Sequence, residues 1–187
     1  HADRQHGRGV RPRIAALDAN IAARPSQADQ LERMGLARDP ALVTQLEAEL
    51  AAITSPDDLR AKYRAHLLAG EMTNAVLTQE RLLALLGDAA TGQDHADLAL
   101  ALVLEAESYV SPEAETALRA ALQRDLTNEL ARYLVGEMFL QGGRFDQAFR
   151  FWRPLLEDSN PAAPWVPAIR ERIGMVADLA GIPYEVP

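Results

Sequence analysis

The chain contains no cysteine among its 187 residues. It therefore can form neither a disulfide framework nor a thiolate metal site, and it has no cysteine nucleophile. Aromatic residues make up only 5% of the sequence, and no apolar run approaches the roughly 18 residues that a membrane-spanning helix needs. A chain of this length can bury enough surface to fold as a single domain without a metal or disulfide.

Basic residues are also scarce. The sequence has 19 lysines and arginines against 27 aspartates and glutamates, which gives a net charge of -8. This balance argues against a nucleic-acid-binding protein, whose binding surface is basic. Residues 1–13 are the exception, with four arginines, one aspartate and no apolar periodicity. We expect them to form a disordered basic tether.

Apolar residues recur with a helical period from residue 14 onward, and no strictly alternating run predicts a strand. Asp39, Ser55 and Ser111 each precede a proline, the arrangement of a capping side chain before the first helical residue. Glycines such as Gly70 and Gly181 mark helix ends. The expected helices span 14–23, 40–53, 56–69, 73–86, 95–108, 112–124, 129–141, 145–158 and 164–180.

The segment 129–162 carries the clearest internal pattern. With Glu129 as position one, Gly136 falls at position eight, Ala148 at position twenty and Trp152 at position twenty-four. Small residues at eight and twenty allow two antiparallel helices to approach, and large residues fill the seam between them. This spacing is typical of the 34-residue tetratricopeptide repeat.

Counting back by 34 residues gives two further units, 95–128 and 56–89, in which Leu102 and Tyr63 replace the glycine at position eight. The predicted fold class is therefore all-α, a right-handed tetratricopeptide superhelix of antiparallel helical hairpins. The predicted organisation is a tether over 1–13, an N-terminal helical extension or degenerate repeat over 14–55, three repeats over 56–162, and a C-terminal capping helix and tail over 163–187. Within the second of these, Ser26 either caps a short helix or lies in a segment that crosses the surface.

The residues do not assemble a catalytic or metal-binding group. His66 falls at a packing position of the first unit, so we expect it to be partly buried. Asp94 and His95 are expected at a helix start, where capping explains them. The acidic residues around the next turn are expected to form a solvated face, and they are Glu105, Glu107, Glu113 and Glu115. We expect no enzymatic activity, cofactor or metal.

The first helix of each repeat lines the concave surface of such a superhelix. Positions two, five, nine and twelve of these helices point into the groove. They are Asp57, Arg60, Arg64 and Leu67 in the first unit, Ala96, Ala99, Val103 and Ala106 in the second, and Leu130, Tyr133, Glu137 and Leu140 in the third. The residues that we predict to contact a ligand are Arg60, Arg64, Leu67, Ala99, Val103, Tyr133, Glu137 and Leu140, together with Trp165 at the start of the expected capping helix. Such a groove suits an amphipathic helical ligand, and Arg60 and Arg64 would hold its acidic groups.

Several stretches together resemble one family. They are Gln93–Ala99, Val110–Glu115, Ala131–Tyr133, Gly136, Met138–Phe139, Ala148–Arg150, Trp152, Pro154–Leu156 and Ala163–Trp165. This set is similar to the periplasmic region of the c-type cytochrome biogenesis protein CcmI, also called CycH, of the α-proteobacterial type. The likeness is strong over 56–187 and weak over 14–55.

The resemblance implies a periplasmic domain that holds the C-terminal helix of unfolded apocytochrome c and delivers it to the haem-ligation complex. It also implies a membrane association through an N-terminal anchor that this sequence lacks. Two other readings remain open. A generic tetratricopeptide scaffold would join folded subunits of another envelope assembly, and a haem-binding protein or enzyme would need His66 or His95 as a ligand.

Overall fold

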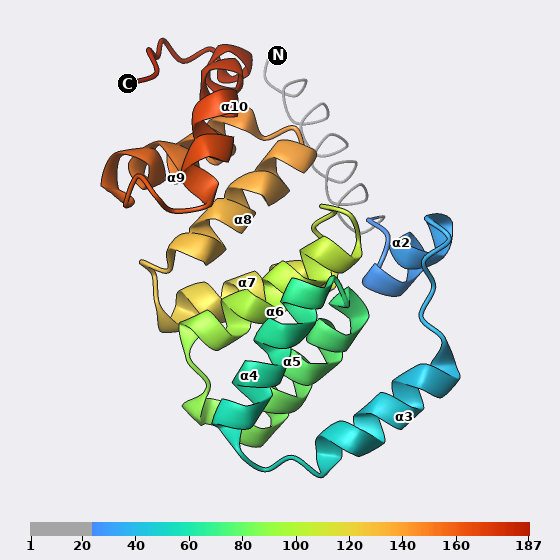
Figure 1. The fold of residues 1–187 in the computed structure, drawn as a ribbon. Helices are drawn as coiled ribbons and strands as arrows, with labels where there is room; N and C mark the ends of the chain where they lie inside the picture. The colour runs from blue at the N-terminus through green and yellow to red at the C-terminus, as the bar shows by residue number, and fades with distance from the viewer. Residues whose placement is uncertain (1–23) are drawn as a thin grey trace, which may run out of the picture.

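The computed structural model describes residues 24–187, and every described element of regular structure is a helix (Figure 1). Two helices precede the expected repeats, α2 (Gln27–Arg33) and α3 (Pro40–Ala51). The remaining elements are α4 (Pro56–Ala69), α5 (Met72–Leu86), the 3₁₀ turn η1 (Gly87–Ala89), α6 (Gly92–Glu105), α7 (Pro112–Arg124), α8 (Glu129–Gln141), α9 (Phe145–Asp158) and α10 (Trp165–Ala180). The all-α class is confirmed for this part of the chain. The expected tether and the helix at 14–23 lie outside the described residues.

The capping residues read from the sequence begin helices as predicted. The side chains of Asp39, Ser55 and Ser111 accept hydrogen bonds from backbone amides of the first turns of α3, α4 and α7. At the other end, Gly70 and Gly181 adopt φ values of 75° and 69°, the left-handed conformation that ends a helix at little cost for glycine. These local signals set most of the boundaries.

Helix α6 departs from its expected span of 95–108. It begins at Gly92 because the Thr91 side chain accepts from the Asp94 amide, while the Asp94 carboxylate accepts from the Thr91 amide. This reciprocal pair is a capping box. The helix ends at Glu105, and Glu107 and Ser108 then adopt φ values of 50° and 79°. The sequence did not predict this left-handed pair, because neither residue is a glycine.

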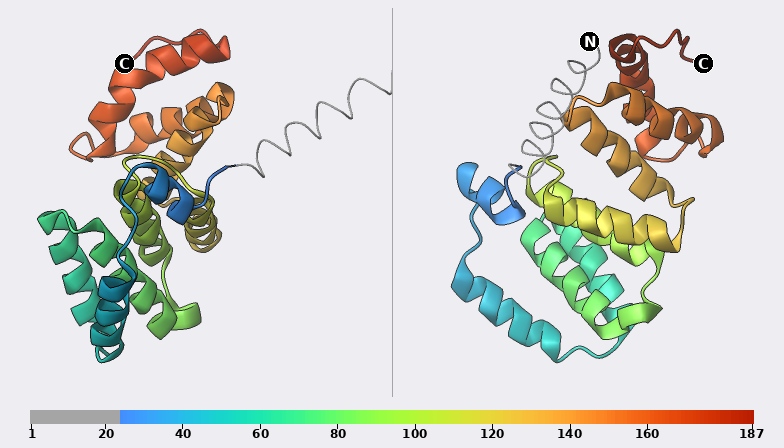
Figure 2. Two further views of the ribbon diagram at one scale, coloured as in Figure 1. Left: turned by 90° about the vertical axis from the view of Figure 1, so that its right-hand side faces the viewer. Right: turned by 180° about the vertical axis from the view of Figure 1, so that it is seen from behind.

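The helices from α4 to α10 pack against their sequence neighbours, with close pairs at α4–α5, α6–α7 and α8–α9, and the division into three repeat units stays a prediction. Viewed from behind, α5 and α7 lie on the near side of the molecule (Figure 2). The main hydrophobic cluster joins α4 to α8, and a second cluster joins α8, α9 and α10. This packing is compatible with a tetratricopeptide fold, while the right-handed superhelix stays a prediction.

The seam of the third hairpin explains its glycine. A Cβ atom added at Gly136 would lie 2.0 Å from the indole Nε1 of Trp152. The indole is completely buried, and its N–H donates to the Tyr133 carbonyl oxygen at 3.1 Å. Helices α8 and α9 can therefore approach only where position eight has no side chain, as the repeat pattern predicted.

The N-terminal helices do not form a further hairpin. Helix α2 lies against α7, whereas α3 lies against α5, and residues 34–39 run between them (Figures 1 and 2). Leu50 of α3 is buried in a small cluster with Leu59, Leu77 and Leu82. The two helices do not pack on each other as α4 and α5 do, and the choice between an extension and a degenerate repeat over 14–55 stays a prediction. Ser26 caps α2 by accepting from the Asp29 amide, so the short-helix alternative is the one observed.

Candidate ligand-binding face

The predicted groove residues of α4 are already engaged within the chain. The Arg60 guanidinium forms two 3.1 Å hydrogen bonds to the Asp94 carboxylate, which is 5% exposed. Burial opposes ionisation of Asp94, but the bonds from Arg60 and Thr91 prevail and lower the pKa of this carboxyl group. Arg60 therefore holds α4 to α6, while Arg64 is exposed and Leu67 packs against the main cluster.

Two predicted groove residues on α6 are wrong in this structure. Ala99 is completely buried and Val103 is 6% exposed, both within the main cluster. Helix α6 is rotated about its axis relative to the prediction. Its most exposed stripe therefore lies one position along the sequence, at Asp97, Leu100 and Leu104. The repeat pattern predicted where α6 lies in the sequence, but it did not predict the rotation of α6 about its own axis.

Asp97 in this stripe has a carboxyl group with a raised pKa. Its carboxylate accepts a 2.8 Å hydrogen bond from the Gln93 side chain. Burial nevertheless raises the pKa of Asp97 to about 6, against the lowering influence of Gln93, Arg64 and Arg60. On the neighbouring helix, Tyr63 donates to the Asp97 backbone carbonyl at 2.7 Å. Contacts between α4 and α6 thus place a weakly solvated carboxyl beside an exposed arginine.

The predicted residues of α8 are half-buried and lie next to the capping helix. Tyr133 stacks on Trp152 with a centroid separation of 6.0 Å. Glu137 pairs with Arg172 of α10 at 2.7 Å, and the Arg172 guanidinium also lies 4.7 Å from the Trp152 ring centre. Burial and the Glu137 carboxylate raise the pKa of Tyr133 to about 12, so the phenol is neutral at physiological pH. Leu140 packs against the C-terminal cluster.

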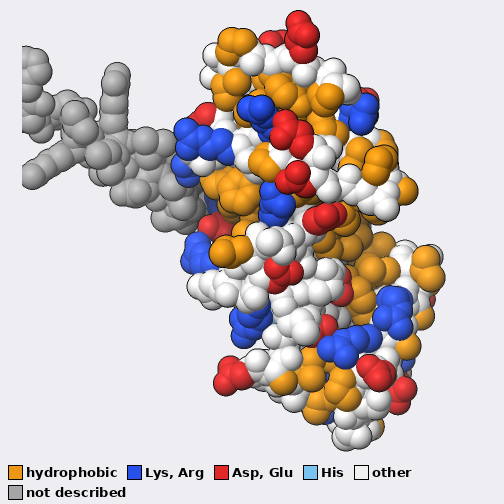
Figure 3. Space-filling view, turned by 90° about the vertical axis from the view of Figure 1, so that its left-hand side faces the viewer, with side chains coloured by type: hydrophobic (Ala, Val, Ile, Leu, Met, Phe, Trp, Pro, Cys, Tyr) orange, Lys and Arg blue, Asp and Glu red, His pale blue; other side chains and the backbone are white. Residues whose placement is uncertain are grey.

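Trp165 begins α10 and is also half-buried. Its indole N–H donates to the Ser159 hydroxyl at 3.2 Å, and its ring packs against the C-terminal cluster. The predicted residues therefore fall into separate groups, one where α4 meets α6 and one where α8 meets α9 and α10. Hydrophobic side chains gather where the molecule narrows between its upper C-terminal part and its lower part (Figure 3).

The acidic residues around the α6–α7 turn correct another expectation. Glu105 is buried, with its side chain 4% exposed, and it pairs with Arg38. The Glu113 carboxylate accepts a 2.9 Å hydrogen bond from the backbone N–H of Gln27, and Glu115 forms an ion pair with Arg24. The solvated-face interpretation is therefore wrong for Glu105, because the N-terminal extension covers that turn.

The remaining candidates offer little chemistry. His66 is partly buried as predicted, and its Nδ1 lies 2.6 Å from Glu71. Within residues 24–187 no three acidic or histidine side chains are grouped in a way that could hold a metal ion. No helix in that range combines the length and apolar character needed to cross a membrane.

The described helices thus define an all-α protein of antiparallel hairpins with a mixed apolar and charged face. The chain is 32% identical over 114 residues to the cytochrome c-type biogenesis protein CycH of Rhizobium meliloti (strain 1021). This match supports the resemblance to CcmI/CycH-like proteins seen in the sequence. It covers 61% of the chain but only 29% of CycH. No protein-family model and no solved structure matches the chain.

Proposed function

We propose that this chain acts in c-type cytochrome maturation as a periplasmic apocytochrome c chaperone. It would bind the C-terminal helical region of the unfolded apoprotein in the groove of a tetratricopeptide superhelix and deliver it to the haem-ligation complex. The observation that carries the proposal is the similarity to a protein named for cytochrome c biogenesis. The apolar and charged face of the hairpins supports it physically, since helical peptides are commonly captured by laying an apolar stripe into such a surface.

The stripe of α6 and the half-buried side chains of α8 supply the proposed contacts. Leu100 and Leu104 would cover part of the apolar side of the ligand helix, and Tyr133 would add a rigid aromatic contact. Ordering a helix from an unfolded chain costs roughly 2–5 kcal/mol, so the affinity should be modest. The net charge of -8 favours basic partners and a salt-dependent association rate.

The test is a calorimetric titration with a synthetic peptide that matches the C-terminal helix of a c-type cytochrome, together with far-UV circular dichroism. We expect saturable binding and a gain in helicity beyond the sum of the two components. A cooperatively folded domain that binds no such peptide would contradict the proposal. Recovery of folded envelope proteins in a pull-down would then favour the alternative, a scaffold that joins folded subunits.

Two leucine variants locate the binding face. Leu104 is 40% exposed on α6, whereas Leu42 is 63% exposed on α3, away from the proposed contacts. We expect Leu104→Asp to weaken peptide binding by at least roughly tenfold, because a carboxylate would replace a buried apolar contact. Leu42→Asp is the matched control and should leave the affinity unchanged. Equal affinities for both variants would show that the peptide binds elsewhere.

A further inference from the structure

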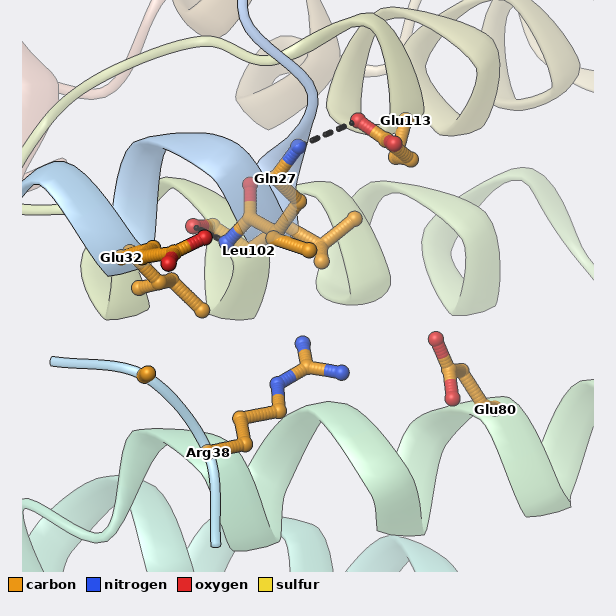
Figure 4. A pocket seen from close by; sticks show the side chains of 9 residues that line it. Gln27, Glu32, Arg38, Glu80, Leu102 and Glu113 are labelled. Atoms are coloured by element: carbon orange, nitrogen blue, oxygen red, sulfur yellow. Dashed lines mark hydrogen bonds between the residues drawn. The ribbon is translucent and has the colours of Figure 1, made fainter. Parts of the chain in front are cut away.

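Residues 24–38 form a segment that belongs to none of the helical hairpins, and we call it the latch. It consists of α2 with the residues on either side of it, and it lies against the end of α6 and the start of α7 (Figure 1). Within α2 only Gln27 and Leu31 are buried. A cavity of about 380 Å³ separates the latch from α5 and is lined by residues that include Arg38, Glu80 and Leu102 (Figure 4). Apolar packing is therefore sparse, and polar contacts hold the latch in place.

Glu105 is the central contact of the latch. Arg38 donates to both carboxylate oxygens, from Nε to Oε2 at 3.0 Å and from Nη2 to Oε1 at 2.6 Å. The Gln27 side chain adds a third bond to Oε1 at 3.0 Å. The Glu105 side chain is 4% exposed, so water cannot replace these donors without local opening. Removing one partner of a buried ion pair leaves an uncompensated charge, which is far more costly than removing both.

The latch also holds the turn between α6 and α7. Gln27 donates to the Leu102 carbonyl at 2.8 Å, and Tyr109 donates to the Pro25 carbonyl at 2.7 Å. Between these contacts, Glu107 and Ser108 adopt positive φ values that are unfavourable for residues other than glycine. A conformation of this kind persists when surrounding contacts over-determine it.

The opposite side of the same turn is held by the end of α8. The Gln141 side chain donates to the Ser108 carbonyl at 2.6 Å and accepts from the Val110 amide at 3.0 Å. The turn is thus clamped between the latch and a neighbouring repeat. Loss of either clamp leaves the strained pair with fewer contacts to hold it.

We propose that the latch is a releasable clamp that keeps the α6–α7 turn in its left-handed conformation. It disengages as one unit when the Arg38–Glu105 pair is broken, and the turn then loosens with it. The hairpins themselves stay folded, because no residue of the latch belongs to the three hydrophobic clusters that form their cores. This role does not depend on what the face binds, although Leu104 belongs to the same turn of α6 and would share in the release.

Hydrogen–deuterium exchange tests the coupling in the full chain. Glu105→Gln removes the charge while keeping the size of the side chain and its capacity for hydrogen bonds, and Arg38→Gln removes the other partner. We expect backbone amides of 26–36 and 103–111 to exchange at least roughly tenfold faster in both variants, with the centres of α8 and α9 unchanged. Arg33→Gln is the matched control, since it alters an exposed arginine of the latch at the end of α2.

Site-directed spin labelling provides a second measurement, because the chain has no other cysteine. Labels at Ala28→Cys on α2 and Ala84→Cys on α5, both exposed positions, report the separation across the cavity. We expect one narrow distance distribution in the otherwise unchanged chain and a broad one with Glu105→Gln. Faster exchange confined to 26–36, or a narrow distribution in the Glu105→Gln background, would overturn the proposal. Uniformly faster exchange along the whole chain would do so as well.

Discussion

Replacing Gly136 by alanine is the sharpest test of the seam between α8 and α9. The new methyl group would meet Trp152 at 2.0 Å from Nε1 and 2.3 Å from Cδ1, distances that no side-chain contact tolerates. The indole must move, and it is completely buried and bonded to the Tyr133 carbonyl. Overpacking of a core costs about 1–3 kcal/mol, and loss of the indole hydrogen bond costs about 1 kcal/mol. Alanine returns up to about 1 kcal/mol of helix propensity.

The expected net loss is therefore about 1–3 kcal/mol of unfolding free energy, measured by urea denaturation followed by circular dichroism. The control is Gly174→Ala in α10, where the nearest atom to an added Cβ is a Val186 methyl at 3.5 Å. Only the propensity gain applies there, so this variant should be equally stable or slightly more stable than the parent. A Gly136→Ala protein as stable as the Gly174→Ala protein would refute the proposed close approach. In a double-mutant cycle, Gly136→Ala should cost less when Trp152 is already replaced by leucine.

Two further changes probe α6 and α3. Asp97→Asn should raise the unfolding free energy at pH 7.5 by about 1–3 kcal/mol, because burial raises the folded-state pKa of Asp97 to about 6 from an ordinary 3.8. The unfolding free energy of the parent should increase as the pH falls through 6. The difference in unfolding free energy between parent and variant should vanish near pH 4, where the unfolded state also takes up the proton. A difference that does not depend on pH would contradict this reasoning. Leu50→Ala should cost about 2–4 kcal/mol because Leu50 is 1% exposed in the α3 cluster, whereas Leu42→Ala should change stability by less than about 0.5 kcal/mol. Equal urea midpoints for the two leucine variants would show that α3 does not pack as described.

Local chemistry accounts for the parts of the fold that could be predicted. A capping side chain such as Ser55 or Ser111 satisfies an amide within three residues of itself, so its effect is visible in the sequence. The spacing of Gly136 and Trp152 likewise reports a contact within one hairpin. Both signals act over short separations, where the backbone geometry of a helix fixes which residues meet.

The candidate face was predicted less well because it depends on rotation about a helix axis. The residues predicted on α8 are half-buried, and their contact with a ligand stays a prediction, whereas Ala99 and Val103 of α6 face the core. A rotation of one position exchanges a buried stripe for an exposed one, and it is set by the sum of contacts with α5, α7 and α8. One signal was available, since Glu105 occupies position eleven, where the third unit has Phe139. A charge at a packing position indicates a buried partner, but its identity does not follow from the repeat.

The sequence by itself determined the helical class, most helix boundaries and the small-to-large packing of the last hairpin, since each arises from neighbours along the chain or from a fixed helical period. Only the tertiary structure decided that α2 and α3 pack separately, that Asp97 is desolvated, and that Arg38 reaches Glu105 across 67 positions of sequence. These features depend on contacts between distant segments. Such contacts form only when many weak interactions together favour one packing of the helices. No short pattern of residues predicts which packing that is.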